Sequence, residues 1–435
     1  MGRSSTPPEP PHYPLAFLWT LAIVLPMHPR ITIAGVGTVA PQGIGNKRYL
    51  DALLNGESGV RAISHFDTTG LSVRFAGYAK EFEPAKYMDE HTLKHVARVV
   101  PMSVAASMEA FAEAGIDHTK LSLEERRRFA VVIGSGGGAM EFVERQYDLW
   151  YKGSVKKASV YVVPSGTMGN MASEVSMAFG LRGPSHVITT GCTSSSDAMG
   201  YAMMLLRDNR ADRVLVGGAD CTVTRGMMEG LCLMGILASK YQAEPARACR
   251  PFDGQRDGFV LSEGAWMMIM EKNGKKSVAE MAGHGGTCDA HHRVRMAEDG
   301  IEPARSMQLA CEDAGVKPED IDSVWLHGTG TQLNDRIESK AVKLFLGDRA
   351  KKIPMTAVKS MIGHPQGACG SAAAVGAILA MHAGAIPPTI NLENPDPECD
   401  LDYTPLRARD CNARVVMIST LGFGSKNAAI VIKRA

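Results

Sequence analysis

The chain carries short, continuous apolar runs that end in glycine. Residues 31–37 (ITIAGVG), 129–136 (FAVVIGSG) and 213–219 (RVLVGGA) show no alternation of polar and apolar positions. A strand that is apolar on both faces is typical of a sheet covered by helices on both sides. By the same criterion, further strands are expected at 185–190, 265–271, 322–327, 353–359, 414–420 and 428–433.

Between these runs, apolar residues recur at spacings of three and four. This period predicts helices over 46–55, 91–114, 193–209, 303–315, 334–347 and 368–384.

The two halves of the chain share a pattern of predicted elements. SHVITTGCTSSSDAMGYA in the first half and MTAVKSMIGHPQGACGSAAAVGA in the second both run from a strand through a loop into a helix of small residues. This repetition predicts a duplicated α/β fold with a site between its halves. We place the first half at 27–278 and the second at 279–435.

Residues 1–26 are expected to form a disordered extension. Proline and serine dominate residues 1–14, and the apolar run at 15–25 is shorter than the ~20 residues that cross a bilayer. Two alternatives stay open: the run has the length of a secretory h-region, and MGRSST fits myristoylation at Gly2. No other segment approaches transmembrane length, so stable membrane insertion is not expected.

Charge and cysteine content narrow the class of protein further. Lys+Arg is 47 and Asp+Glu is 46, so there is no basic excess that would favour nucleic acid as a partner. The 9 cysteines include no CxxC pair. An odd number without framework spacing indicates reduced thiols, and we therefore expect a cytoplasmic protein.

Cys192 stands where a thiol can become a nucleophile. It follows a buried strand and directly precedes a helix that opens with Thr and Ser. The positive end of a helix dipole favours the thiolate. A small buried core thiol is the alternative, which we prefer for the other cysteines.

Two histidines occupy matching positions in the second half. His327 ends one predicted strand in HGTGT, and His364 follows another in KSMIGHPQG. Side chains at such strand ends face the cleft where α/β proteins bind ligands. A lone histidine is more often structural, but two with a helix-start cysteine indicate a catalytic trio. There is no HxxxH pair, and Asp335 and Glu338 are also typical of a solvated helix face, so no metal is predicted.

At these residues the chain resembles a known family. The motifs are TTGCTSSSDA, PFDGQRDGFVLSEGA, HGTGTQLNDRIE, KSMIGHPQGACGSAA, PPTINLENPDPECDLDYTP and GFGSKNA, in that order between about residue 30 and residue 433. Together they resemble the β-ketoacyl-[acyl-carrier-protein] synthases, the single-function condensing enzymes of type II fatty acid synthesis. The resemblance implies the thiolase-like fold, with two halves in five layers αβαβα, and a homodimer.

The resemblance also implies a reaction and its residues. Cys192 matches the acyl-accepting nucleophile, and His327 and His364 match the two histidines that act on the malonyl thioester. The product would be a 3-oxoacyl-[acyl-carrier-protein]. No cofactor is implied on the enzyme, because 4′-phosphopantetheine arrives on its partner, the acyl carrier protein.

Further residues match supporting roles in the family. Lys359 matches the lysine that orders the site, and Glu338 matches the glutamate that pairs with it. Thr329 and Thr331 match hydroxyls that hold the pantetheine arm. Phe423 matches the gating phenylalanine, whose backbone N–H forms the oxyanion hole with that of Cys192. For the acidic carrier protein we expect a dock at Lys156 and Lys157, with Arg126 to Arg128 as a possible extension.

Several positions depart from the family pattern. Gly191 replaces an alanine before the nucleophile, and Ser425 and Lys426 replace a glycine and a small polar residue in the gate loop. The segment 271–279 is short, which predicts the loss of a peripheral helix, and the acidic residues at 89–91 stand where relatives are basic. Gly137 replaces a bulky aliphatic residue at the bottom of the acyl tunnel, so we expect an open acyl pocket; packing of Gly137 within its own turn is the alternative.

Three other functions share part of this pattern. A thiolase would need a second cysteine in the C-terminal loop, where GFGSKNA has none. A non-catalytic chain-length factor would lack the nucleophile that Cys192 supplies. A ketosynthase of a polyketide or specialised lipid pathway would carry the same motifs and stays open.

Overall fold

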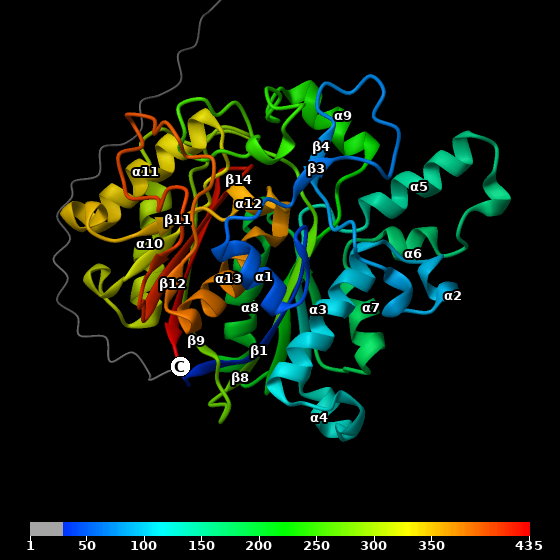
Figure 1. The fold of residues 1–435 in the computed structure, drawn as a ribbon. Helices are drawn as coiled ribbons and strands as arrows, with labels where there is room; N and C mark the ends of the chain where they lie inside the picture. The colour runs from blue at the N-terminus through cyan, green and yellow to red at the C-terminus, as the bar shows by residue number, and fades with distance from the viewer. Residues whose placement is uncertain (1–28) are drawn as a thin grey trace, which may run out of the picture.

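Five layers make up the part of the chain that the computed structural model describes, residues 29–435 (Figure 1). The middle layer consists of α8 (Ser194–Arg207) and α13 (Cys369–Ala383), and a sheet packs on each side of it. Helices α3 (Val99–Ala114) and α7 (Asn170–Phe179) cover one outer face, and α10 (Ile301–Ala314) and α11 (Gln332–Leu346) cover the other. The predicted αβαβα architecture is therefore confirmed. The expected extension at 1–26 lies outside the described residues.

Each half supplies one of two packed β layers, called the first and the second sheet below, and hydrogen bonds join the two layers into one sheet of 11 strands within residues 29–435. The first sheet has the order β6 (Ser185–Ile188), β5 (Phe129–Gly134), β7 (Arg213–Asp220), β8 (Gly264–Lys272) and β1 (Ile31–Ala40). The second has the order β9 (Ala279–Cys288), β15 (Lys426–Arg434), β14 (Val415–Gly422), β10 (Ser323–Trp325) and β11 (Met355–Thr356). Hydrogen bonding continues from β1 to β9 through the pairs Thr32–Glu280 and Ile33–Ala279.

Parallel strands in each sheet bring loops to one edge. β6, β5 and β7 run parallel to one another, and so do β11, β10 and β14. Carboxyl ends of parallel strands meet at the same edge, which is where α/β proteins bind ligands. The segments that follow these strands carry the cysteine, the histidines and the lysine singled out above.

Most predicted elements match the observed ones, but two of them are altered and the strand β9 was not predicted. The predicted helix 91–114 is broken, because α2 (Glu90–Leu93) ends before α3 begins at Val99. The predicted strand 353–359 is only two residues long, and Lys359 opens the short helix α12 (Lys359–Ile362) instead. β9 was missed because its glycine-rich sequence, AEMAGHGGTC, hides the apolar pattern.

The connection between the halves is short. β8 ends at Lys272 and β9 begins at Ala279, with no helix between them, which agrees with the expected loss of a peripheral helix. The boundary between the halves at residue 278 stays a prediction.

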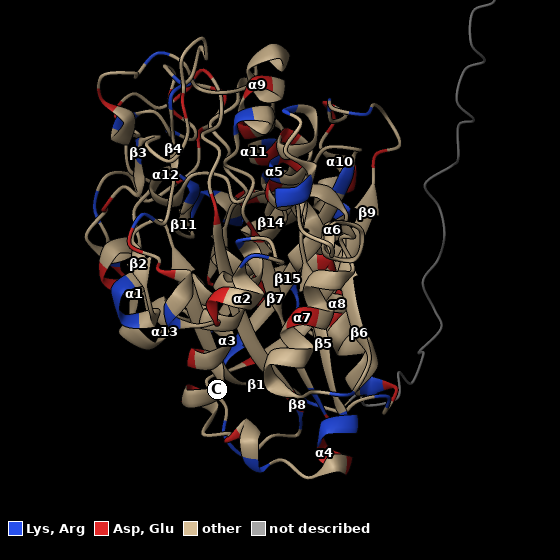
Figure 2. Ribbon diagram, turned by 90° about the vertical axis from the view of Figure 1, so that its right-hand side faces the viewer, with Lys and Arg blue, Asp and Glu red and all other residues tan. Residues whose placement is uncertain are grey.

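Charged residues of both signs are scattered over the outer helices and loops (Figure 2). The arginines at 126–128 lie at α4 (Leu123–Arg127), at the end of the molecule opposite α9 (Arg225–Met234). Arg126 donates to the backbone carbonyls of Leu121 and Phe179, and Arg128 pairs with Asp212 at 2.7 Å. Arg126 and Arg128 thus hold neighbouring segments of the fold together, which argues against a docking role for these two arginines. Within 29–435, no helix has the length and apolar character needed to span a bilayer.

Close packing of β9 against α10 gives a test of this fold. A Cβ at Gly285 would clash with the backbone of Ser306, whereas a Cβ at Gly230, in the exposed interior of α9, would meet no atom within 4 Å. We expect Gly285→Ala to lower the free energy of unfolding by about 2 kcal/mol or more. Gly230→Ala should raise it by roughly 0.5–1 kcal/mol, because alanine restricts the unfolded chain. Urea unfolding of both variants checks this, and equal effects would contradict the packing.

Candidate active site

Cys192 lies in a single turn between a strand and a helix. The turn Gly191–Thr193 follows β6, and α8 begins at Ser194. Gly191 has φ +70°, a left-handed conformation that favours glycine. The Ser194 hydroxyl donates to the Gly191 carbonyl at 2.6 Å and accepts the Thr190 N–H at 2.9 Å. These bonds fix the backbone on both sides of the nucleophile.

His327 is held through its backbone by a buried carboxylate. Glu338, on α11, accepts the N–H of His327 at 2.7 Å and that of Gly328 at 2.8 Å. Lys359 donates to the carbonyl of His327 at 2.7 Å and lies 3.2 Å from its Nδ1. In the described structure, Glu338 and Lys359 thus act on the same histidine from two sides. The expectation that Lys359 pairs directly with Glu338 is wrong. Lys359 donates instead to the carbonyl of His327, and Glu338 accepts the backbone N–H groups of His327 and Gly328.

His364 is fixed by bonds to a neighbouring loop. Its N–H donates to the carbonyl of Val260 at 2.6 Å, and its Nδ1 accepts the N–H of Gln366 at 3.1 Å. Since Nδ1 of each histidine faces a donor, we infer that each ring carries its proton on Nε2. Both imidazoles can therefore donate a hydrogen bond from Nε2.

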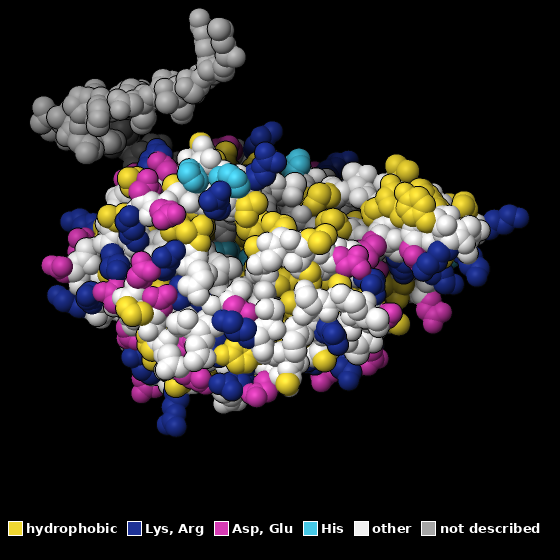
Figure 3. Space-filling model, turned by 90° about the horizontal axis from the view of Figure 1, so that it is seen from above, with side chains coloured by type: hydrophobic (Ala, Val, Ile, Leu, Met, Phe, Trp, Pro, Cys, Tyr) yellow, Lys and Arg dark blue, Asp and Glu magenta, His cyan; other side chains and the backbone are white. Residues whose placement is uncertain are grey.

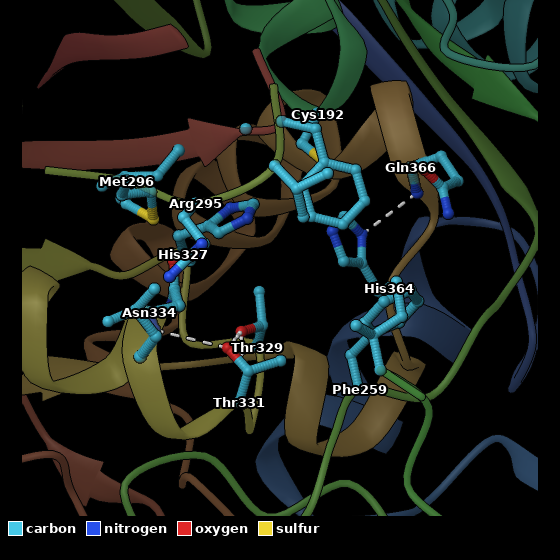
Figure 4. Close-up of a pocket in the computed structure, with 16 residues that line it drawn as sticks. Cys192, Phe259, Arg295, Met296, His327, Thr329, Thr331, Asn334, His364 and Gln366 are labelled. Carbon is cyan, nitrogen blue, oxygen red and sulfur yellow. Dashed lines mark hydrogen bonds between the residues drawn. The ribbon is translucent and has the colours of Figure 1, made fainter. Parts of the chain in front are cut away.

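The three predicted reactive side chains come together. The ligand atoms of Cys192, His327 and His364 all lie within 4.8 Å of one another, and all three residues are buried. The histidine rings meet edge to face, with centroids 5.2 Å apart. They lie at a cavity of about 190 Å³ (Figure 4). Its other lining residues are Ile236, Phe259, Val294, Arg295, Met296, Thr329, Thr331, Leu333, Asn334, Gln366, Leu421, Gly422 and Phe423.

Burial keeps this trio uncharged. It raises the pKa of the Cys192 thiol to about 12, although Lys359 and the N–H of Phe423 act in the opposite direction. It also lowers the pKa of both imidazoles well below the usual value, and the charge of Lys359 lowers them further. The expectation that the helix start favours a thiolate is therefore not confirmed: in the closed cavity, desolvation outweighs it.

Thiol and imidazole groups are also the donor types that zinc prefers. Cys192, His327 and His364 form the sole such group within reach of one ion among the described residues. Lys359, 3.2 Å from His327, places a positive charge beside the group, which opposes a cation. The absence of a metal stays a prediction.

The gate residue lies on a turn that is tied to the cavity mouth. Phe423 follows β14 and is 38% exposed. In the same turn, Ser425 is buried, and its hydroxyl accepts the N–H groups of His291 and His292 at 3.2 and 3.1 Å. The serine that departs from the family pattern thus binds the gate turn to the segment that precedes Val294 and Arg295.

Gly137 does not line the cavity at Cys192. Its N–H donates to Asp220 at 2.8 Å, and a Cβ at this position would clash with the Thr222 side chain. These contacts match the alternative in which Gly137 packs within its own turn. Its effect on acyl chain length stays a prediction, and an isoleucine there would also require a smaller residue at 222.

Two polar residues near the site were not foreseen. The Cys369 thiol donates to the carbonyl of Cys192 at 3.0 Å. Asp220 is buried and accepts N–H groups from Gly136 and Gly137 of one half and Gly367 of the other, at 2.7–2.8 Å. The sequence pattern places Asp220 at the end of a buried strand, and this position is the signal that could have indicated it. The residues that Asp220 binds are remote in the chain, so the sequence pattern does not reveal them.

Burial of the thiol predicts how Cys192 reacts with pH. Alkylation by iodoacetamide requires the thiolate, so with a pKa near 12 the rate should rise about tenfold per pH unit from pH 7 to pH 10. The reaction rate of an unstructured peptide with one cysteine, whose pKa is about 8.5, should level off within this range. Peptide mass spectrometry of the Cys192 adduct measures the rate. A plateau below pH 8 would show that the helix start does hold a thiolate.

The raised pKa of Glu338 predicts that the free energy of unfolding depends on pH. Burial raises the pKa of Glu338 to about 7, while the N–H groups of His327 and Gly328 act against this shift. A raised pKa means that the folded state loses stability as the pH rises from the unfolded value of 4.5 to 7. Glu338→Gln cannot ionise, so relative to wild type its free energy of unfolding should increase by on the order of 2 kcal/mol between pH 5 and pH 8. Urea unfolding at both pH values tests this, and the opposite trend would mean that the two N–H donors keep Glu338 ionised.

Comparison with known proteins agrees with this site. Residues 28–275 match the family model of the β-ketoacyl synthase N-terminal domain, and 278–393 match that of the C-terminal domain. A protein of Streptomyces halstedii named as a polyketide β-ketoacyl synthase 1 is 37% identical over 93% of this chain and 98% of its own length. A 3-oxoacyl-[acyl-carrier-protein] synthase 2 of Synechocystis is 34% identical with the same coverage.

Solved structures show the same fold. A β-ketoacyl synthase from Burkholderia phymatum superposes with a TM-score of 0.85 at 30% identity, over 94% of this chain and all of the other. A type II polyketide ketosynthase, solved with its acyl-carrier protein and bound to a hexaketide, gives a TM-score of 0.86 at 27% identity, over 94% of this chain and all of the other. The chain belongs to the β-ketoacyl synthase family of condensing enzymes.

Proposed function

We propose that this chain condenses an acyl group carried on Cys192 with malonyl-[acyl-carrier-protein] and releases a 3-oxoacyl-[acyl-carrier-protein] in fatty acid elongation. The observation that carries the proposal is the grouping of one thiol and two imidazoles within 4.8 Å at one cavity. The relatives named 3-oxoacyl-[acyl-carrier-protein] synthase 2 support the same reaction.

The first step transfers the acyl group. The Cys192 sulfur attacks the acyl thioester, and the proton of the thiol leaves with the sulfur of the departing pantetheine. The backbone N–H groups of Cys192 and Phe423 are proposed to bind the oxyanion. The Phe423 N–H already contacts the Cys192 thiol, where it lowers the pKa of that thiol.

The second step removes carbon dioxide from the malonyl thioester. The C–C bond to the carboxylate breaks, and its electron pair becomes an enolate with charge on the thioester oxygen. His327 and His364 donate from Nε2 to this oxygen. Their lowered pKa values suit the role, because a neutral imidazole keeps a fixed donor and does not protonate the carbanion.

The third step forms the new C–C bond. The enolate carbon attacks the carbonyl of acyl-Cys192, and the tetrahedral intermediate expels the Cys192 sulfur as a thiolate, which then takes a proton from solvent water. Lys359 is proposed to act as a positioning residue, since it holds His327 at two atoms. Glu338 supports the same histidine from its backbone.

The substrates are proposed to arrive on an acyl carrier protein, which brings its own phosphopantetheine. Thr329 and Thr331 line the cavity and are proposed to contact the pantetheine arm. Lys156 and Lys157 are exposed on the turn after α5 (Met140–Tyr151) and remain candidates for the carrier dock.

A cytoplasmic homodimer is the proposed state of the enzyme. Large apolar side chains are exposed around α5, α6 (Val162–Gly166) and α7: Tyr147, Tyr151, Val155, Val160, Val163 and Met177. Figure 3 shows an apolar area at the projecting end of the molecule, where Figure 1 places α5. β6, next to α7, ends its sheet with one open edge. A second copy would cover both features.

A ketosynthase of a polyketide or specialised lipid pathway is the alternative. The reaction and the residues are the same, and only the acyl group on Cys192 differs. The relatives named as polyketide synthases and the solved ketosynthase bound to a hexaketide favour this alternative.

Separate readouts for acylation and decarboxylation test the proposal. Cys192→Ser should lower acyl loading by at least about a hundredfold, because serine forms its anion far less readily. His327→Ala and His364→Ala should each lower carbon dioxide release by at least about a hundredfold and acyl loading much less. Mass spectrometry of the adduct and labelled malonyl-[acyl-carrier-protein] provide the two measurements.

Cys311→Ala, in the core of the second half, is the control and should leave both steps intact. Acyl loading of Cys192→Ser at the wild-type rate would overturn the nucleophile. Equal losses of both steps in the histidine variants would overturn their assignment to the enolate.

A further inference from the structure

The polar side chains at the cavity differ in whether they already have partners. The hydroxyls of Thr329 and Thr331 bond to each other at 3.0 Å, and the amide of Asn334 donates to Asp335 at 3.1 Å. The side-chain amide of Gln366 makes no hydrogen bond to any described residue, although it lines the same half-closed cavity. Arg295 likewise has no side-chain partner within 29–435, but it is exposed at the mouth, where water solvates it. Gln366 therefore brings a free donor and acceptor to the reactive centre.

The backbone fixes Gln366 in this position. Its φ is +47°, in the left-handed region that residues other than glycine rarely adopt. Such a conformation persists where the surroundings enforce it, often at functional sites. The Gln366 N–H donates to His364 Nδ1 at 3.1 Å, and the next N–H, of Gly367, donates to Asp220 at 2.7 Å. The amide is thus placed on a segment that is bonded on both sides.

The position of Gln366 separates it from the residues assigned to the pantetheine arm. Figure 4 shows Gln366 beside His364 and near Cys192, whereas Thr329, Thr331 and Asn334 lie across the cavity. Gln366 also adjoins Gly136, since a Cβ on that glycine would lie 3.4 Å from the Gln366 Cβ. If the arm runs along the threonine wall, the acyl group on Cys192 extends toward the Gln366 wall.

We propose that the Gln366 amide binds an oxygen near the thioester of the acyl group on Cys192, so that the enzyme prefers acyl chains with a keto or hydroxyl group at C3. This inference rests on the proposed condensation at Cys192 and names the class of its acyl substrate. A C3 oxygen fits the polyketide alternative, because the acyl chains of fatty acid elongation are saturated at C3. A saturated chain packed against the amide would displace water and offer no partner, which is costly for a polar group. A C3 oxygen would accept from the amide N–H, and a C3 hydroxyl could also donate to its carbonyl. One such hydrogen bond corresponds to a preference of about tenfold.

Competition between matched acyl donors tests the proposal. Pantetheine thioesters of hexanoic, 3-hydroxyhexanoic and 3-oxohexanoic acid are supplied separately, and the rate of adduct formation on Cys192 is followed by mass spectrometry. Wild type should load the two oxygenated chains about tenfold faster than hexanoyl. Gln366→Met keeps the length of the side chain but removes the amide, and should bring the ratio close to one. Gln366→Asn, which tolerates a left-handed backbone but has a shorter reach, should give an intermediate ratio.

Gln308→Met, the same substitution on the exposed face of α10, is the matched control and should keep the wild-type ratio. Thermal unfolding shows whether each variant is folded. Equal loading of all three chains by wild type, or an unchanged ratio in both Gln366 variants, would overturn the proposal. A loss confined to malonyl decarboxylation would also overturn it, because Gln366 would then act on the other substrate. Failure of every thioester to load Cys192 would instead overturn the proposed function itself.

Discussion

The cavity depends on the close approach of two helix starts in the middle layer. The N–H of Ser371, near the start of α13, donates to the hydroxyl of Ser195, near the start of α8, at 3.0 Å. A side chain at Gly370 would clash with Ser196. The small residues that open both helices are therefore a packing requirement, because larger ones would push the helices apart. As a result, the nucleophile of the first half and the histidines of the second half share one cavity.

The same burial sets the electrostatics of the site. Burial disfavours charge on any group without a partner, so the thiol and both imidazoles are held neutral. The other ionisable groups at the site are bonded: Lys359 donates to the carbonyl of His327, and Glu338 accepts two backbone N–H groups. The protein therefore supplies fixed neutral donors where negative charge develops during the reaction, which is an effective way to stabilise an oxyanion or enolate.

Loops from the two halves are joined at several points around the cavity. Asp220 bonds to the loop after β5 and to Gly367, which follows Gln366. Cys369 bonds to the carbonyl of Cys192. Ser425 bonds the gate turn to the mouth of the cavity. Two residues that depart from the family pattern fit local partners here. Gly137 leaves room for the Thr222 side chain, and the Ser425 hydroxyl makes hydrogen bonds that a glycine could not make.

The sequence pattern by itself predicted a duplicated α/β fold and indicated Cys192, His327 and His364, because these signals are local, whereas the five layers were implied by the resemblance of its motifs to the β-ketoacyl synthases. Apolar runs mark the strands, and Cys192 and His327 stand shortly after such runs, whereas His364 follows the short helix α12 that comes after β11. Only the tertiary structure decided how these residues are supported. The partners of Glu338, Arg126 and Gly137 were misjudged or left open, since each depends on contacts that the sequence pattern does not encode. The protonation state of Cys192 also depends on tertiary structure. The sequence shows that Cys192 stands at a helix start, but the burial that raises the pKa of its thiol arises only when the two halves pack together.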